Sequence, residues 1–266
     1  MSEARYFAAD TADAFERERL EYLRQMCDPV TARRLEAIGV AEGWRCLEVG
    51  AGDGSVACWL AERVGPQGRV VATDINPRFL HDLEVPNLEV RHHHIVNDDL
   101  ERAYYDLVHC RAVLMHLVQP MHALKRMAAA VRPGGWLCIE EGDYGMCGAA
   151  DPTHPAAERF TRTLRAALDA LHAGEVMNPY FDRQVPKLVE GLGFVDVGND
   201  AMTWVSRGQD AGARFHRLGL AVVRRAMIAE GVLTEDDCAV LEQLYEEPSF
   251  AFIGFVLSGA WGRRTS

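Results

Sequence analysis

The stretch from Cys46 to Asn76 constrains the fold more than any other part of the chain. It reads CLEVGAGDGSVACWLAERVGPQGRVVATDIN, in which a short apolar strand carries an acid, Glu48, near its end. A helix and a second strand follow, and Asp74 comes just past the apolar core of that second strand. The turn between the first strand and the helix holds three glycines: Gly50, Gly52 and Gly54. This order is typical of the nucleotide-binding half of a doubly wound α/β sheet.

The spacing of the glycines indicates which nucleotide fits. A dinucleotide fingerprint is G-x-G-x-x-G, which seats a pyrophosphate on the helix N-terminus. Here the third glycine comes one residue early, and Glu48 precedes the turn. A carboxylate at this place repels a pyrophosphate and attracts an ammonium group. Asp74 is placed to take both hydroxyls of a ribose. The turn therefore favours a nucleoside with an amino-acid-like end.

The rest of the chain alternates between strands and helices. This alternation predicts parallel pairing of the strands. Strands are expected at 45–49, 69–73, 88–95, 105–110, 136–140, 194–197 and 250–257. Helices are expected at 10–38, 55–64, 120–131, 151–173, 183–191, 208–229 and 235–247, with a short one after Asn76-Pro77.

We interpret residues 1–266 as one domain with helical additions. A helical cap covers 1–43, and the cofactor-binding core covers 44–145. Two helical inserts, 146–181 and 207–248, flank the later strands. Insertions near the carboxyl ends of such strands tend to form a lid over the ligand crevice.

Composition narrows the function classes. The formal net charge is -11, so the chain lacks the basic footprint of a protein that binds long nucleic acids or anionic membranes. Seven cysteines occur without a C-x-x-C pair, which favours a reducing compartment. There is no 18-residue apolar run, and the N-terminus is charged too early for a signal peptide. We expect a cytoplasmic protein whose partner is a small molecule rather than nucleic acid or membrane.

Four further segments extend the pattern beyond the glycine turn. They are NLEVRHHHIVNDDL at 87–100, YDLVHCRAVLMHL at 105–117, LKRMAAAVRPGGWLCIEE at 124–141 and LVEGLGFVDVG at 188–198. Together with the turn, the chain resembles the class I S-adenosylmethionine-dependent methyltransferases, in particular bacterial small-molecule enzymes of secondary metabolism. The resemblance implies a Rossmann-like α/β fold with a seven-stranded, mainly parallel sheet whose last strand is antiparallel.

The resemblance also implies the cofactor, S-adenosyl-L-methionine, and the residues that hold it. Glu48 and the backbone of Gly50 and Gly52 are expected to bind the methionine moiety. Asp74 is expected to bind the ribose, and Ile75 to pack on the adenine face.

The chain departs from the family pattern after the third strand. The acid that usually meets the adenine amino group is replaced by His94, followed by Ile95. Either His94, a backbone carbonyl or Asp98 takes that role. Arg111 and Leu114, after the fourth strand, are expected to line the sulfonium region.

Other positions are candidates for closure and catalysis. Tyr6 and Arg19 of the N-terminal segment are expected to close over the carboxylate end of the cofactor, Arg19 as a bidentate clamp. His116, Glu141 and Asp143 are candidate catalytic bases, and His116 has an ordinary pKa near neutrality. Because a sulfonium is already an activated methyl donor, alignment alone could suffice without any base.

Two other patterns have weaker functional interpretations. In a strand, His92 and His94 share a face while His93 points away, so at most two of the three could converge on a metal. No complementary ligand cluster accompanies them, and we expect no metal. Asn178-Pro179-Tyr180 is similar to the N-P-P-Y loop of some methyltransferases, but it does not follow the fourth strand, where that loop must lie.

The predicted function is methyl transfer from S-adenosylmethionine to an O, N or C atom of a small molecule, in natural-product biosynthesis. The alternatives are methylation of a macromolecule such as RNA or protein, and a non-catalytic protein that binds S-adenosylmethionine. A nicotinamide dehydrogenase is disfavoured by the glycine spacing. The oligomeric state is open, with a homodimer through the inserted helices as one alternative.

Overall fold

The computed structural model describes residues 11–265, which divide into two compact units. The unit that we call the sheet unit comprises Asp28–Glu141, Phe181–Ala201 and the chain from Ser258 onward. The second, the helical unit, comprises the described residues up to Cys27, together with Gly142–Tyr180 and Met202–Leu257. The predicted inserts fall almost entirely in the helical unit, and the single-domain assignment stays a prediction.

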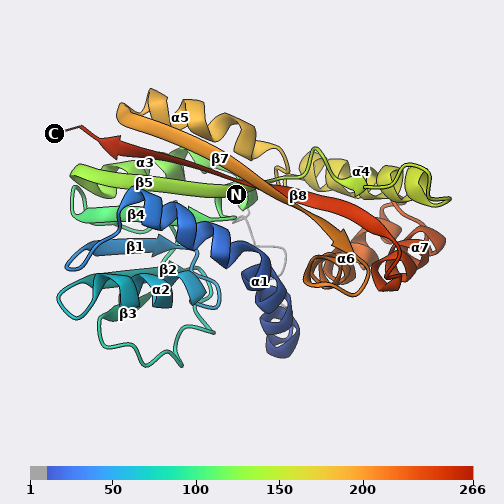
Figure 1. Cartoon of the computed structure of the whole chain (residues 1–266), viewed down its shortest axis with the longest axis horizontal. Helices are drawn as coiled ribbons and strands as arrows, with labels where there is room; N and C mark the ends of the chain where they lie inside the picture. Colours follow the sequence, from blue (N-terminus) through green and yellow to red (C-terminus); the bar gives the residue numbers. More distant parts are fainter. Residues whose placement is uncertain (1–10, 266) are drawn as a thin grey trace. The chain divides into compact units, whose positions relative to one another are not determined.

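Parallel strands form the centre of the sheet unit. They are β1 (Arg45–Val49), β2 (Arg69–Asp74), β3 (Leu88–His92), β4 (Tyr105–Arg111) and β5 (Val131–Asp143). The strand order is β3-β2-β1-β4-β5-β8, with β7 paired to β8, and the β3-β2-β1-β4-β5 pairs are parallel. Strands β7 (Phe194–Arg207) and β8 (Ala251–Arg264) run in opposite directions in Figure 1. The sheet unit therefore has the Rossmann-like order that the glycine turn predicts.

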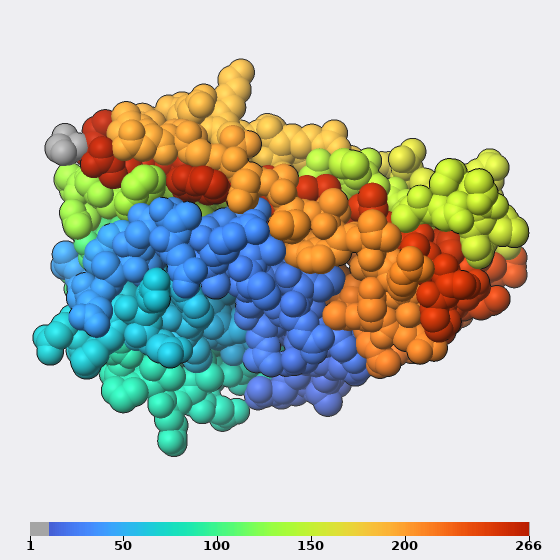
Figure 2. Space-filling view, in the orientation of Figure 1, coloured from blue at the N-terminus to red at the C-terminus, as the bar shows by residue number. Residues whose placement is uncertain are grey.

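Helices cover both faces of this sheet. They are α1 (Asp13–Ile38, in the sheet unit from Asp28 on), α2 (Ser55–Val64), α3 (Pro120–Ala130) and α5 (Val185–Gly191), with two 3-10 turns, η1 (Leu114–His116) and η2 (Phe181–Gln184). Strand β2 lies on one side of β1, and β5 on the other side of β4, so right-handed crossovers place α2 and α3 on opposite faces. Figure 1 shows α1 and α2 in front of the central strands. In Figure 2 the atoms of α1 form part of the surface of this face. The carboxyl ends of the strands remain the place where a ligand can approach.

The core of the sheet unit follows from this packing. Apolar residues of α2 (Val56, Ala57, Leu60, Ala61 and Val64) meet Cys46, Val70, Ala72 and Leu107 of the strands. Each of these strands is buried along most of its length, as expected for strands covered on both faces. Among the described residues, no helix is long and apolar enough to span a bilayer.

The helical unit is built from α4 (Ala157–Ala173), α6 (Ala211–Ala229) and α7 (Glu235–Glu246). Asp210 caps α6 by accepting from the Ala213 amide, and Thr234 forms a capping box with Asp237 at the start of α7. The core is rich in aromatic rings, with Phe160 in contact with Tyr245, Phe250 and Phe252. A two-residue strand, β6 (Gly148–Ala149), pairs antiparallel with β8.

Several boundaries differ from the sequence-based expectation. Over residues 11–265 the sheet has eight strands rather than seven, because the two residues of β6 are too few to give a pattern. The helix expected after Asn76 is wrong: residues 77–83 form successive turns, in which Leu80 donates to the Pro77 carbonyl. Strands β7 and β8 extend well beyond 197 and 257. The outer part of β7 alternates between exposed and half-buried positions, so it carries no apolar run that would reveal it.

Candidate cofactor-binding site

The glycine turn between β1 and α2 is folded back onto β2. Gly50, Gly52 and Gly54 all have positive φ (70°, 58° and 84°), which glycine adopts without steric cost. The amide of Gly50 donates to the Thr73 carbonyl at 2.8 Å. A Cβ on Gly50 would lie 2.4 Å from a methyl group of Val113, so no other residue fits there without displacement. The turn thus brings the backbone close to the segment that follows β4.

Asp74 is held at the end of β2 by the same turn. Its Oδ2 accepts from the Gly52 amide at 2.9 Å, and its Oδ1 accepts from the Asn76 amide at 2.8 Å. Burial raises its pKa, although the two amide bonds act in the opposite direction. A carboxylate has about four acceptor positions. Two of them are therefore still available to the hydroxyls of a ribose. Ile75, the next residue, keeps 41% of its surface exposed, which suits packing against an adenine face.

The segment after β3 forms one local turn. His94 donates its backbone amide to Asp98 Oδ2 at 2.7 Å, and its Nδ1 accepts from the Val96 amide at 3.2 Å. The His94 amide bond lowers the pKa of Asp98. Ile95 is buried. Both alternatives for the adenine amino group, His94 and Asp98, thus lie in the same turn, and the choice between them stays a prediction.

Glu48 is buried and already has a partner. Only 2% of the residue is exposed, and its Oε2 lies 2.6 Å from Nδ1 of His109. The register pairs Glu48 of β1 with His109 of β4, so the contact follows from the sheet itself. The other ring nitrogen of His109, Nε2, lies 3.4 Å from Glu140 Oε2. Burial alone would lower the pKa of His109, but the two carboxylates raise it to about 9. The imidazole is therefore a buried cation at neutral pH.

Further buried charges continue from Glu140. Arg34 Nη1 donates to Glu140 Oε1 at 2.7 Å, and the Thr31 hydroxyl donates to the other oxygen at 2.5 Å. The Nε of Arg34 donates to Asp200 at 2.5 Å. Burial would raise the pKa of Glu140, but His109 and Arg34 lower it to about 2. The chain thus places alternating charges beneath the carboxyl edge of the sheet.

Sequence reasoning missed this network of His109, Glu140 and Arg34. The available signal was a titratable residue next to an apolar stretch in each of two strands, His109 after Leu107-Val108 and Glu140 after Leu137–Ile139. Ligand atoms of His109, Cys138 and Glu140 also lie within 4.8 Å of one another, a spacing compatible with a metal ion. Because His109 and Glu140 already pair with Glu48 and Arg34, we assign this group to the ion-pair network.

Glu141 fixes the segment after β4. It is fully buried and accepts from the backbone amides of Val113, Leu114 and Met115 at 3.1, 2.7 and 3.3 Å. Burial raises its pKa to about 8, against the effect of these amides. Leu114 is fully buried as well, and His116 ends the turn that Glu141 holds. The roles predicted for Glu141, Leu114 and His116 at the reacting centre stay predictions.

The remaining predicted residues lie elsewhere in the chain. Arg19 and Asp143 belong to the helical unit. Arg19 makes a bidentate pair with Glu16, at 2.9 and 2.7 Å, and its guanidinium lies 5.4 Å from the centre of the Phe215 ring. Asp143 accepts from the Gly145 amide at 2.8 Å. Tyr6 lies outside the described residues.

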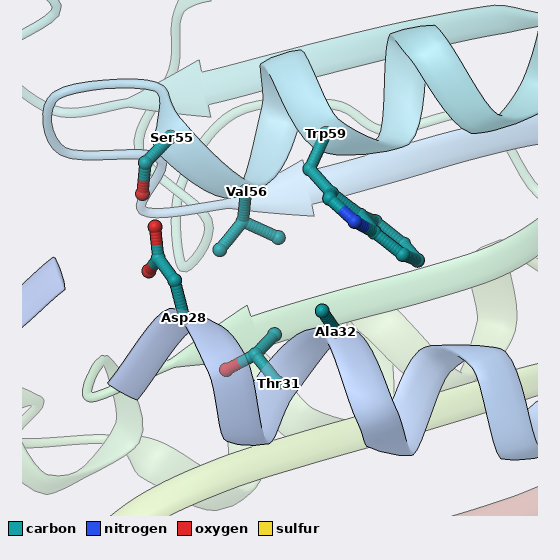
Figure 3. A pocket seen from close by; sticks show the side chains of 6 residues that line it. All are labelled: Asp28, Thr31, Ala32, Ser55, Val56 and Trp59. Atoms are coloured by element: carbon teal, nitrogen blue, oxygen red, sulfur yellow. The ribbon is translucent and has the colours of Figure 1, made fainter. Parts of the chain in front are cut away.

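Arg111 forms an ion pair with Asp28, a residue that the sequence analysis did not identify as a candidate. Its Nη2 lies 2.8 Å from Oδ1 of Asp28, and its Nη1 donates to the Thr31 hydroxyl at 3.0 Å. Asp28 lines a cavity of about 40 Å³ between α1 and α2 (Figure 3). The other lining residues are Thr31, Ala32, Ser55, Val56 and Trp59.

Comparison with known proteins agrees with this geometry. A family model described as a methyltransferase domain matches residues 47–137, which include the glycine turn, Glu48, Asp74 and His109. This match and the methyltransferase relatives described next support a class I S-adenosylmethionine-dependent methyltransferase.

Individual relatives are distant. Methyltransferase str2 of Strobilurus tenacellus is 29% identical over 176 residues, 64% of this chain and 63% of the relative. An uncharacterized 37.1 kDa protein in transposon TN4556 of Streptomyces fradiae is 27% identical over 81% of this chain and 63% of its own length. The chain thus spans less than two thirds of the length of these relatives.

The fold is also found in a solved structure. Haemonchus contortus phosphoethanolamine N-methyltransferase 2, bound to phosphomonomethylethanolamine and S-adenosylhomocysteine, superposes with a TM-score of 0.62. The alignment covers all of this chain and 61% of that protein, at 13% identity. At this identity the likeness is one of fold.

Proposed function

We propose that this methyltransferase transfers the methyl group of S-adenosylmethionine to an O, N or C atom of a small organic molecule, without a metal, in natural-product biosynthesis. The observation that carries the proposal is the end of β2. There Asp74 is fixed by two backbone amides, and Ile75 exposes an apolar side chain next to it. These two residues fit the ribose and the adenine of the cofactor.

The cofactor supplies a methyl group that is already activated by the sulfonium. The chain's contribution is then alignment of the acceptor and, for a weakly acidic acceptor, removal of its proton. Glu141 contributes to alignment because its carboxyl group holds the backbone of residues 113–115 in place. Both oxygens of Glu141 already accept from these amides, which favours a positioning role over removal of the acceptor's proton. His116 and Asp143 stay the candidates for that step.

Two features favour a small acceptor. The net charge of -11 disfavours long contacts with nucleic acid. In addition, the chain carries helical additions of the kind that enclose small substrates, here α4, α6 and α7.

The test separates binding from transfer. Calorimetry of the purified protein with S-adenosylmethionine and S-adenosylhomocysteine should show one-site binding of both. The protein is then incubated with methyl-labelled S-adenosylmethionine and a lysate of its natural host, and the products are dialysed. We expect label in the dialysable fraction beyond a control without the protein.

The other outcomes overturn the proposal. Label in retained RNA or protein would assign a macromolecular acceptor. Binding without any transfer would assign a non-catalytic protein that carries or senses the cofactor, and absence of binding would reject the cofactor itself.

A further inference from the structure

An accessible acid would favour binding of the ammonium group at the cofactor's methionine end. The acid that the sequence offers, Glu48, is 2% exposed and lies 2.6 Å from the His109 imidazole. To bind the ammonium group, Glu48 would have to break its contact with His109. That would leave the buried imidazole without one of its counter-charges, which costs free energy. The structure therefore leaves this part of the ligand without its expected partner.

Asp28 is an acid in the right surroundings. It lies in α1 beside Pro29, and its side chain keeps 29% of its surface exposed. Its carboxylate points across the cavity between α1 and α2, toward Ser55 (Figure 3). The ion pair with Arg111, at 2.8 Å, fixes its orientation. Asp28 is thus an oriented carboxylate that faces open space.

This cavity adjoins the glycine turn on two sides. Ser55 directly follows Gly54, the last glycine of the turn. Arg111 is two residues before Val113, whose methyl group lies against Gly50. The cavity volume of about 40 Å³ gives room for about three water-sized groups, comparable to an α-ammonium, its carbon and a carboxylate.

The charges around the cavity complement a zwitterion. Asp28 supplies a negative charge on the side of α1. The N-terminal end of α2 lies opposite, where the helix dipole favours an anion such as the α-carboxylate. Ala32, Val56 and Trp59 line the remaining wall with mostly apolar surface.

We propose that Asp28, in the cavity between α1 and α2, binds the ammonium group of the cofactor's methionine end, in place of Glu48. This inference rests on the proposed function, because it assigns a subsite of the same cofactor. Arg111 acts as a positioning residue for Asp28, and the Glu48–His109 pair holds the strands beneath.

The experiment compares two ligands that differ only at this end. S-adenosylhomocysteine carries the amino acid group, whereas 5'-methylthioadenosine lacks it and retains the adenine, ribose and sulfur. Asp28→Asn should weaken S-adenosylhomocysteine binding roughly 10- to 100-fold, the scale of a hydrogen bond to a charged group. The affinity for 5'-methylthioadenosine should stay unchanged. Calorimetry measures both.

A matched control lies on the same helix. Glu36 is an acid of α1 that pairs with Arg63 at 3.7 Å on the surface, with half of its side chain exposed. Glu36→Gln removes the same charge from the same helix, and both affinities should equal those of the wild type.

A second variant tests the cavity without changing a charge. Ala32→Leu adds bulk to the cavity wall and should also weaken S-adenosylhomocysteine binding while sparing 5'-methylthioadenosine. If either variant binds S-adenosylhomocysteine as the wild type does, the inference is wrong. It is also wrong if Asp28→Asn weakens both ligands equally, since that indicates a structural role. If the wild type binds neither ligand, the proposed function fails instead.

Discussion

His109 in the sheet unit and His216 in the helical unit show how differently the two units treat a polar group. His109 lies between the carboxylates of Glu48 and Glu140, and its pKa is raised to about 9. His216 lies among aromatic rings, and burial lowers its pKa to about 4. Those rings belong to Tyr144, Phe215, Tyr245, Phe252 and Phe255. One imidazole is therefore held as a cation and the other as a neutral ring.

The two histidines show that the interiors of the two units are stabilised by different interactions. The sheet unit concentrates charges near the carboxyl ends of its strands, and it stabilises them by pairing. The helical unit relies on aromatic packing, in which a neutral imidazole is accommodated as one more ring. We therefore expect the two units to respond to different extents to the same substitution and in opposite directions to the same change of pH.

The largest effect should come from replacing each histidine by leucine. His109→Leu leaves two buried carboxylates without their cation and should lower the free energy of unfolding by about 3–5 kcal/mol. His216→Leu removes ring contacts only and should cost about 1 kcal/mol. Urea unfolding followed by circular dichroism measures both. Equal losses would contradict the comparison.

The pH dependence of stability sharpens the same contrast. The pKa of His109 is raised from 6.5 to about 9. Its contribution to the free energy of unfolding is therefore complete below pH 6.5 and is lost as the pH rises toward 9. The pKa of His216 is lowered from 6.5 to about 4. The free energy of unfolding is therefore unaffected by this group above pH 6.5, and it decreases as the pH falls toward 4, because the unfolded state binds the proton more readily.

Each limb of the pH profile should amount to up to about 3 kcal/mol, and the His216 limb should be smaller because that residue is only partly buried. Melting temperatures recorded from pH 4 to 10 provide the measurement. His109→Leu should remove the alkaline limb, whereas His216→Leu should flatten the acidic one. A variant that flattens the opposite limb would show that another group is responsible.

We expect the acidic side chains at the edge of the sheet unit to affect the affinity for the cofactor more than the free energy of unfolding. Asp74→Ala should weaken S-adenosylhomocysteine binding by about 1–3 kcal/mol, because it removes hydrogen bonds to a charged group. Asp98→Ala, in the turn after β3, tests the alternative for the adenine amino group in the same titration. If Asp74→Ala leaves the affinity unchanged, the ribose contact is misassigned.

The smallest effect should come from an exposed apolar residue at the same edge. Ile75→Ser should weaken binding by about 0.5–1 kcal/mol, since part of one side chain no longer packs on the ligand. Val195 in β7 has nearly the same exposed fraction, 40% against 41%, and Val195→Ser is the matched control. A loss of affinity in both variants would point to a general effect rather than an adenine contact.

The sequence determined the parts of this protein that depend on local physics. The positive φ at Gly50, Gly52 and Gly54 and the position of Asp74 follow from residues close together in the chain. These features predicted the strand–turn–helix unit, the alternation of strands and helices predicted the parallel pairing, and the family resemblance implied the cofactor. The sequence did not predict the two residues of β6 or the half-exposed outer part of β7, because neither segment contains an apolar run.

Only the tertiary structure decided which charges meet. Glu48 and His109 are 61 residues apart, and Arg34 and Glu140 are 106 apart, so no local spacing links them. Their pairing depends on the register between β1 and β4 and on the packing of α1, both of which are set by the burial of many apolar side chains at once. For the same reason, the sequence indicated an acid for the cofactor's ammonium group, but only the fold showed that Glu48 is enclosed while Asp28 faces a cavity.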